Sequence, residues 1–142
     1  MKIRKATLRD SKKILKLFNS DANLVGDDEL KYKDYHIQEY LTNPIHKLFV
    51  AEIDKKVVGA LLTEFWKKAQ YVYMNDLVID KKFQGKGIGT ALNNYVEDLA
   101  KKQGHHLIFF FTEVDNKKMQ SLAKKLNFKK GKKFYFFSKG LK

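Results

Sequence analysis

The order of strand-like and helical segments predicts a single domain of the mixed α/β class, spanning residues 1–142. A first strand and two helices are followed by three strands in series, and helix and strand then alternate twice. The length suits one domain, and the chain has one Pro and no linker. We therefore expect a central mixed, mostly antiparallel sheet of about six to seven strands, with roughly four helices on its two faces.

The first part of the chain predicts one strand and two helices. Residues 2–8 alternate polar and apolar side chains, which is the period of a strand. An acidic loop at residues 20–29 precedes a second helical segment at 31–41, which ends before Pro44. The first helix lies between the strand and this loop, and its apolar face consists of Ile14, Leu15, Leu17 and Phe18.

The middle of the chain predicts three antiparallel strands. Residues 47–53 and 57–65 are rich in apolar side chains, and the polar residues 54–56 between them are typical of a hairpin turn. Residues 70–79 form the third strand. Because their connections are short, we expect the three strands to be neighbours in the sheet.

The last part predicts two helices and two strands. Apolar residues recur at helical spacing from Ile88 until Gly104 ends the helix. Leu107–Phe111 is a continuous apolar run, so we expect a strand that is covered on both faces. Helical spacing returns over residues 116–126, and the aromatic run Phe134–Phe137 predicts the final strand.

Composition excludes several kinds of site. The chain has no Cys, which excludes disulfides, thiolate metal ligands and Cys nucleophiles. None of its four His residues forms an i, i+4 pair, so we expect no dedicated metal site. Its longest apolar run is far shorter than a membrane span and no signal-peptide pattern is present, so we expect a cytoplasmic protein without membrane contact.

The net charge of +13 favours binding to polyanions. Only two of the 29 basic residues are Arg, the residue that nucleic-acid sites prefer for its forked guanidinium. We therefore expect a phosphate-bearing cofactor, with incidental and sequence-independent binding to RNA. The charge is unevenly distributed, because residues 117–142 carry ten Lys and no acid, whereas residues 17–30 carry four acids and no base.

A glycine-rich segment, Gln84–Thr90, lies between the strand that ends at Ile79 and the next helix. Glycines let backbone N–H groups approach a ligand, and a helix N-terminus adds free donors and a positive dipole end. The segment therefore predicts a pyrophosphate site. The dinucleotide motif GxGxxG does not fit because Thr90 occupies its third glycine, and a P-loop does not fit because no Ser or Thr follows Lys86.

The spacing Gln84-x-x-Gly87-x-Gly89 resembles the Q/R-x-x-G-x-G/A signature of the GNAT acetyltransferase superfamily, and the order of elements is similar over nearly the whole chain. The resemblance implies an N-acetyltransferase that uses acetyl-CoA, with the pyrophosphate on this turn and the pantetheine arm along the preceding strand. The residues implied in acetyl-CoA binding are Leu77, Val78, Ile79, Gln84, Gly85, Lys86, Gly87, Ile88, Gly89, Thr90 and Asn116.

Residues 116–128 partly resemble the family's second signature, N-x-x-A-x-x-x-Y-x-x-x-G-F. Ala123 stands where many members have the Tyr that protonates the departing thiolate. The thiolate could leave without a protein acid, or Tyr135 or Tyr95 could replace that Tyr, and Tyr135 is our candidate. Asn127 replaces the Gly of the G-F pair, a mild change because Asn tolerates the left-handed conformation of a helix C-cap.

An amine acceptor needs a base, because most amines are protonated at neutral pH. Residues 71–77 are similar to the E-D-L/F-x-V strand of diamine-type acetyltransferases, with Asn75 at the Glu position and Asp76 at the Asp position. Asp76 is the first candidate for the base, and Glu113 and Asp115, which follow the next strand, are the second candidates. Acceptor contacts are expected from one face of this strand, unless a bulge intervenes, and from the acidic loop: Tyr71, Tyr73, Asn75, Asp27, Asp28 and Glu29.

Two other functions remain open at this point. One is a non-catalytic acyl-CoA-binding protein, and the other is a basic RNA- or ribosome-binding module on the same fold. The acceptor is also open, with small amines, polyamines and protein amino groups all compatible with the sequence. The oligomeric state is open too, a homodimer included.

Overall fold

The computed structural model describes residues 1–21 and 31–141, which form two compact units divided after Phe111. That both units belong to one domain remains a prediction. The first unit contains β1 (Lys2–Lys5), η1 (Leu8–Asp10), α1 (Ser11–Ser20), α2 (Asp34–Thr42), β2 (His46–Ile53), β3 (Lys56–Trp66), β4 (Tyr71–Ile79), η3 (Lys81–Phe83), α3 (Ile88–Lys102) and β5 (Leu107–Phe109), and the second contains α4 (Lys117–Lys125).

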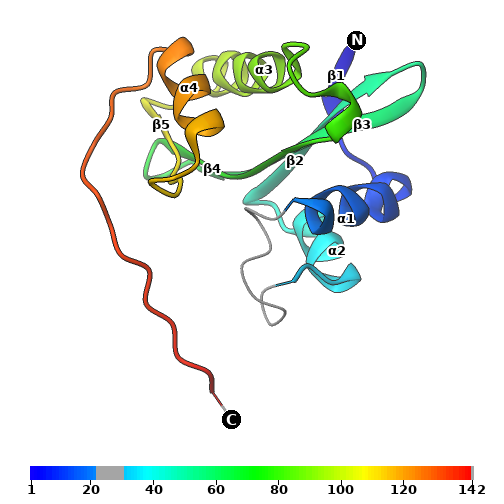
Figure 1. Ribbon diagram of the computed structural model, residues 1–142, viewed down its shortest axis with the longest axis horizontal. Coiled ribbons are helices and arrows are strands. Elements are labelled where there is room, and N and C mark those ends of the chain that lie inside the picture. The colour runs from blue at the N-terminus through cyan, green and yellow to red at the C-terminus, as the bar shows by residue number, and fades with distance from the viewer. Residues whose placement is uncertain (22–30, 142) are drawn as a thin grey trace. The chain divides into compact units, whose positions relative to one another are not determined.

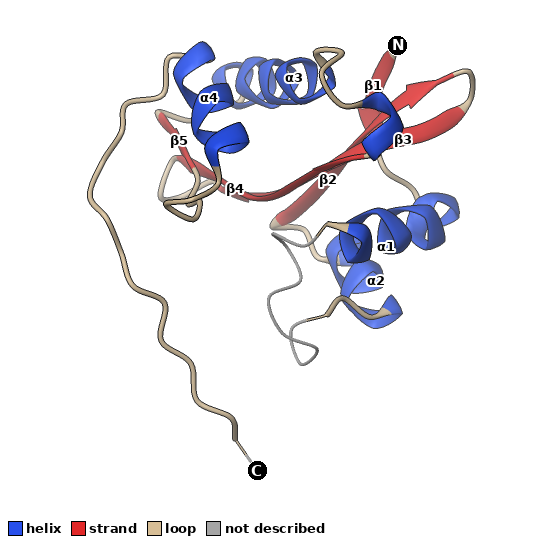
Figure 2. Ribbon diagram, viewed as in Figure 1, coloured by secondary structure: helices blue, strands red, loops and turns tan. Residues whose placement is uncertain are grey.

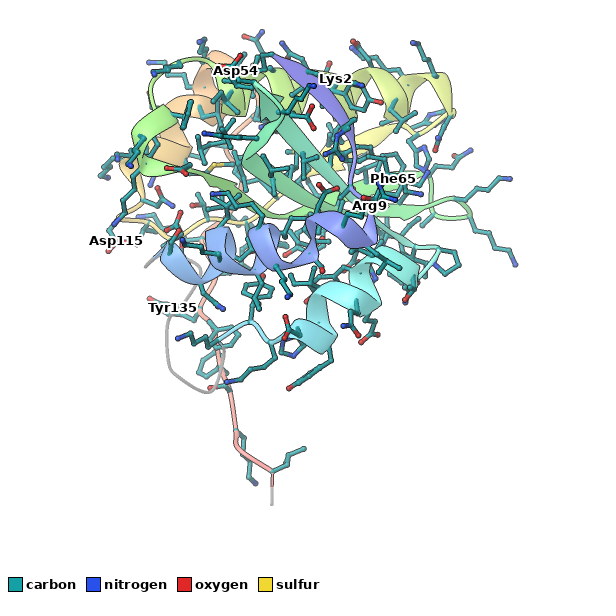
Figure 3. The ribbon with its side chains drawn as sticks, turned by 90° about the vertical axis from the view of Figure 1, so that its right-hand side faces the viewer. Lys2, Arg9, Asp54, Phe65, Asp115 and Tyr135 are labelled. Carbon is teal, nitrogen blue, oxygen red and sulfur yellow. The ribbon has the colours of Figure 1, made fainter. Side chains whose placement is uncertain are left out.

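The sheet of the first unit has the order β1-β2-β3-β4-β5 (Figure 1). The first four strands are antiparallel, and β5 is parallel to β4. The predicted β2–β3 hairpin is confirmed, with Asp54 and Lys55 at φ 49° and 62° as the two turn residues. Positive φ at both positions is typical of a type I′ turn, whose twist matches the flanking strands. Lys2 and Asp54 lie at the same end of this sheet (Figure 3).

Helices cover both faces of the sheet in this unit, with α1 and α2 on one face and α3 on the other (Figure 2). β3 is buried over seven consecutive residues, Val57–Thr63, because it faces helices on both sides. On the α1–α2 side the core consists of Ala6, Ile14, Leu17, Phe18, Ile37, Leu48, Val50, Val57, Ala60, Leu62 and Val78.

Gly59 on β3 brings the start of α3 close to the sheet. A Cβ at this position would lie 2.8 Å from Ile79 Cδ1 and 3.2 Å from Ile88 Cγ2. Both residues flank the predicted pyrophosphate turn, since Ile79 ends β4 and Ile88 begins α3. The close approach at Gly59 therefore fixes the two ends of the turn.

The prediction of six to seven strands is wrong, because the sheet formed by the described residues has five. The predicted last strand, Phe134–Phe137, is neither helix nor strand, and its side chains are 71–89% exposed. The strand predicted at 107–111 is shorter and is not covered on both faces, since Leu107 and Phe111 are each 57% exposed. Local apolar runs report hydrophobicity but not the distant partner that a strand requires.

Candidate active site

The predicted pyrophosphate turn opens the backbone toward solvent. Gly85 and Gly87 have φ of +75° and +79°, a conformation that side chains other than Gly rarely adopt. Apart from each glycine and its two chain neighbours, no atom of residues 1–21 and 31–141 lies within 4 Å of where a Cβ would stand at either residue. The two glycines are therefore required by the backbone conformation, and the space beside them can receive a ligand.

The first turn of α3 supplies backbone donors beside these glycines. The hydrogen bond from Ala91 N to Gly87 O, at 3.0 Å, is the first of the helix, so the N–H groups of residues 88–90 precede it. Gly87 is the N-cap and offers no side chain to these donors. Gln84 Nε2 donates to Ile79 O at 3.1 Å and ties the turn to the end of β4. Free donors at a helix N-terminus fit a pyrophosphate.

One edge of β4 is open next to this turn. β4 pairs with β3 as far as Ile79, whereas its pairing with β5 covers only Tyr71–Tyr73. Within residues 1–21 and 31–141, no strand pairs with the other edge of residues 74–79. An extended ligand arm with amide groups, such as pantetheine, can bind a strand edge of this kind.

A β-bulge interrupts β4 at the start of this open edge. Leu62 pairs with Asp76 and Thr63 pairs with Met74, so Asn75 is the extra residue. Residues opposite one another share a face, and Leu62 belongs to the core under α1 and α2. The bulge therefore places both Asn75 and Asp76 on the α1–α2 side. We call the polar residues of β3 and β4 on this side the acceptor face: Glu64, Trp66, Tyr71, Tyr73, Asn75 and Asp76.

Glu64 lies at the centre of the hydrogen bonds on the acceptor face. Its Oε1 accepts from Asn75 Nδ2 at 3.0 Å, and its Oε2 accepts from Trp66 Nε1 at 2.8 Å. His46 Nε2 lies 3.5 Å from Oε1. The carboxylate is thus oriented by side chains from β2, β3 and β4.

Asp76, the predicted base, accepts a hydrogen bond from the Tyr32 hydroxyl. Burial, followed by the negative charge of Asp76, raises the pKa of Tyr32 far above its usual range. Burial and the charges of Asp76 and Glu64 also raise the pKa of Tyr40 and of Tyr73. All three phenols therefore stay protonated at neutral pH.

Aromatic rings border the two carboxylates. Tyr73 stacks on Phe109 with ring centroids 5.2 Å apart, and Tyr71 lies 6.1 Å from Trp66. Aromatic faces carry negative potential and attract cations. The acceptor face therefore combines carboxylates and rings, which suits a positively charged amine.

The second unit holds the remaining predicted residues. Asn116 caps α4, its side chain accepting from Met119 N at 3.1 Å, and Ala123 lies within this helix. Asn127 has φ +62°, and the N–H of Phe128 donates to Ala123 O, so the predicted left-handed C-cap is confirmed as a Schellman motif. Glu113 and Tyr135 are exposed, and their catalytic roles remain predictions.

Some site residues were missed from the sequence, and some predictions lie outside the structure. Asp27, Asp28 and Glu29 lie outside the described residues. Sequence reasoning missed the carboxylate of Glu64 and the residues around the two carboxylates, namely Tyr32, Tyr40, His46 and Trp66. The sequence did contain one indication of Glu64, because it is the only charged residue within the apolar strand segment 57–65.

No helix within residues 1–21 and 31–141 is long and apolar enough to cross a membrane.

Among curated proteins, an uncharacterized N-acetyltransferase of Methanocaldococcus jannaschii is 33% identical over 85 residues, which cover 56% of this chain and 38% of the relative. A D-amino-acid N-acetyltransferase of Saccharomyces cerevisiae is 31% identical over 70 residues, covering 49% and 44%. The match spans less than half the length of these relatives.

Solved structures share the fold over almost the whole chain. An aminoglycoside acetyltransferase from an uncultured soil metagenomic sample, in complex with sisomicin, gives a TM-score of 0.81 at 21% identity, covering 99% of this chain and 96% of that one. A ribosomal-protein-alanine N-acetyltransferase from Brucella melitensis gives 0.77 at 17% identity, covering 97% and 99%. The model of the acetyltransferase (GNAT) family matches residues 12–128. The chain therefore belongs to the GNAT acetyltransferase family.

Proposed function

We propose that this protein is an acetyl-CoA-dependent N-acetyltransferase whose acceptor is a primary amine. The observation that carries the proposal is the position of β4, which ends at the open glycine turn and presents Asp76 on the acceptor face at its bulge. Donor and acceptor sites thus meet at one strand. The similar curated and solved proteins include acetyltransferases named for aminoglycosides, D-amino acids and a ribosomal protein, which supports the reaction class.

The chain's own groups fit acetyl-CoA, which when bound supplies an acetyl group activated as a thioester. The N–H groups of the Gln84–Thr90 turn and the first turn of α3 would hold the pyrophosphate, with Lys86 nearby as a cation. The open edge of Leu77–Ile79 would align the pantetheine arm. Backbone N–H groups at this edge would also polarise the acetyl carbonyl.

The acceptor amine would lie on the acceptor face and attack directly in a ternary complex. The chain has no Cys, so a Cys-linked acyl-enzyme is excluded. Asp76 is the proposed base for the amine, directly or through water, with Glu113 as the alternative. Tyr135 is the proposed acid for the departing thiolate.

Acetyl-CoA turnover against a panel of amines tests this function. The panel should include monoamines, diamines, an aminoglycoside, amino acids and peptide N-termini, with thiol release and product mass as readouts. We expect thiol release that depends on one class of amine. CoA binding without thiol release for any amine would contradict the proposal and favour the non-catalytic acyl-CoA binder.

A second candidate function rests on the C-terminal segment. Tyr135, Phe136 and Phe137 are 79–89% exposed and lie among Lys residues. Exposed aromatic and basic side chains are typical of single-stranded nucleic-acid binding. RNA binding that is salt-resistant and sequence-selective, and that is lost when Tyr135, Phe136 and Phe137 are all replaced by Ala, would favour this second function. Weak and salt-sensitive binding would instead be an incidental effect of the positive charge.

A further inference from the structure

Tyr32 connects α1 with β4, and its backbone is held by α1. Tyr32 N donates a hydrogen bond to Asn19 Oδ1, and Asn19 Nδ2 donates one to Tyr32 O, both at 3.0 Å. Because the two bonds join the same pair of residues, they fix both the position and the direction of the Tyr32 backbone. The residue just before α2 is thereby attached to the last turn of α1.

The ring of Tyr32 is fixed by packing. It stacks on Phe18 of α1 with ring centroids 4.9 Å apart, and it meets Tyr40 of α2 edge-on at 6.3 Å. Phe18 is fully buried, and Tyr32 packs against the core to which Phe18 belongs. Side chains in a packed core occupy well-defined rotamers. The direction of the Tyr32 hydroxyl is therefore set by α1 and α2 before a substrate binds.

This hydroxyl donates to Asp76 Oδ2, next to the bulge of β4. Tyr32 thus joins α1 to the strand that carries the proposed base. A carboxylate has about four lone-pair sites, so a hydrogen bond at one of them is compatible with accepting a proton at another. The contact restricts the rotation of the carboxylate while leaving its chemistry as a base intact.

Tyr32 itself does not exchange protons at neutral pH. Burial, followed by the negative charge of Asp76, raises the pKa of the Tyr32 phenol far above its usual range, so the hydroxyl remains a donor. A neutral donor that bonds to a carboxylate favours its ionised form without cancelling its charge. The role that this leaves to Tyr32 is to orient Asp76 and to keep it ionised.

Asp76 also lies among other titratable groups. Those on the elements around it include Tyr40 of α2, Tyr73 of β4, Glu64 of β3 with His46 of β2, and Lys13 of α1 with Asp80. Removal of the Tyr32 hydroxyl changes none of these residues. A different titration of Asp76 after its removal would therefore report the hydroxyl itself.

We propose that Tyr32 is a positioning residue for acetyl transfer, which holds the Asp76 carboxylate ionised and oriented to take the proton of the acceptor amine. Tyr32 contacts neither the amine nor CoA in this role and acts through Asp76. This inference rests on the proposed function, because it concerns the base of the same site.

The test begins with Tyr32→Phe, which removes the hydroxyl and keeps the ring on Phe18. Loss of a hydrogen bond to the ionised form should raise the pKa of Asp76, so that its carboxyl titrates about one to two pH units higher. A carbon-13 NMR titration measures this without CoA or turnover, with the signal assigned by its absence in Asp76→Asn. In kinetics, the acid limb of kcat/KM against pH should move in the same direction, while CoA affinity stays unchanged.

Two further variants show whether the effect passes through Asp76. Asn19→Ala releases the Tyr32 backbone but keeps the hydroxyl, and it should shift the Asp76 titration in the same direction by a smaller amount. This variant keeps the inference testable even where Tyr32→Phe unfolds. Combined with Asp76→Asn, Tyr32→Phe should cause no further loss of kcat/KM, because the base on which it acts is already absent.

Tyr35→Phe is the matched control, because it removes the same hydroxyl from a residue of α2 that is 64% exposed. It should leave both the Asp76 titration and the pH profile unchanged. An Asp76 carboxyl that titrates at the wild-type pH in folded Tyr32→Phe and Asn19→Ala would overturn the inference. An equal shift in Tyr35→Phe would overturn it as well.

Thiol release separates this inference from the proposed function. A titration of Asp76 that depends on Tyr32, without thiol release for any amine, would confirm that Tyr32 controls Asp76 and refute the acetyltransferase activity. Thiol release with the same pH profile in the wild-type protein and in Tyr32→Phe would support the activity and overturn the inference.

Discussion

The glycine turn and the acceptor face lie at the same strand but are built in different ways. The turn, residues 84–90, is continuous in sequence and presents backbone N–H groups. The acceptor face joins side chains of β3 and β4, and its carboxylates are held by Tyr32 and His46 from elsewhere in the chain. A backbone site of this kind can bind a constant group such as pyrophosphate, whereas a side-chain site can change its substrate by single substitutions.

This difference predicts separate effects on the two substrates. Changes in the turn should weaken CoA binding for every acceptor. Changes on the acceptor face should alter turnover and acceptor choice while CoA still binds.

The largest effect is expected on the acceptor face. Asp76→Asn keeps the size of the side chain but removes the proposed base, so kcat/KM should fall by roughly a hundredfold or more. CoA affinity, measured by calorimetry, should stay within about twofold, since general-base catalysis acts on the amine. If Asp76→Asn is fully active and Glu113→Gln is not, the base is Glu113 instead.

The turn offers a matched pair of glycines for the next test. Gly87 and Gly104 have φ of +79° and +77°, and each would have open space around a Cβ. Replacement by Ala strains both by about 1–2 kcal/mol, but only Gly87 lies in the turn. Gly87→Ala should weaken CoA binding by about tenfold or more through that strain and crowding of the phosphates. A similar loss in Gly104→Ala would mean that the effect is a general one on α3.

The ion pair between Arg4 of β1 and Asp10, which precedes α1, should make the stability of the fold sensitive to acid. Asp10 is buried before α1 and accepts from Arg4 Nη1 and Nη2 at 2.8 and 2.9 Å. The hydrogen bond from Arg4 is the main reason that the pKa of Asp10 lies below its usual value. A lowered folded pKa contributes stability above the unfolded pKa, about 3.9, and this contribution is lost as pH falls through the folded value.

Asp10→Asn should therefore cost roughly 1–3 kcal/mol at neutral pH and less in acid. Thermal melts of both proteins across pH would measure this difference. Curves that stay parallel down to the lowest pH would show that the ion pair does not contribute.

The smallest effect is expected for Ala123→Tyr in α4. If the thiolate lacks a protein acid, a phenol at this position should raise the turnover rate severalfold. Over-packing of this half-buried position can cost about 1–3 kcal/mol, so a thermal melt has to accompany the rate. A folded variant with unchanged rate would point to another acid, and Tyr135→Phe would then be expected to lose rate while still binding acetyl-CoA.

The sequence predicted the glycine turn and most helices and strands, because these depend on residues that are close together in the chain. Gly87 with positive φ, the Asp54–Lys55 hairpin turn and the Asn127 C-cap follow from residue types at fixed spacing. The strand predicted at Phe134–Phe137 was wrong, because pairing requires a partner far away in sequence.

The composition of the acceptor face also depends on contacts between distant parts of the chain, which the sequence alone does not reveal. The bulge at Asn75 decides which side chains share a face, and alternation in the sequence cannot reveal it. Tyr32 meets Asp76 across 44 positions of the chain, so only the fold brings them together.

The most direct test of the two-site account is an amide NMR titration of the 16.6 kDa protein, first with CoA and then with an amine that supports turnover. We predict that CoA shifts the amide signals of residues 84–90 and of Leu77–Ile79 first. The amine should then shift those of Glu64, Tyr73 and Asn75. If CoA leaves the turn unchanged, or if the amine shifts signals away from β3 and β4, the account is contradicted.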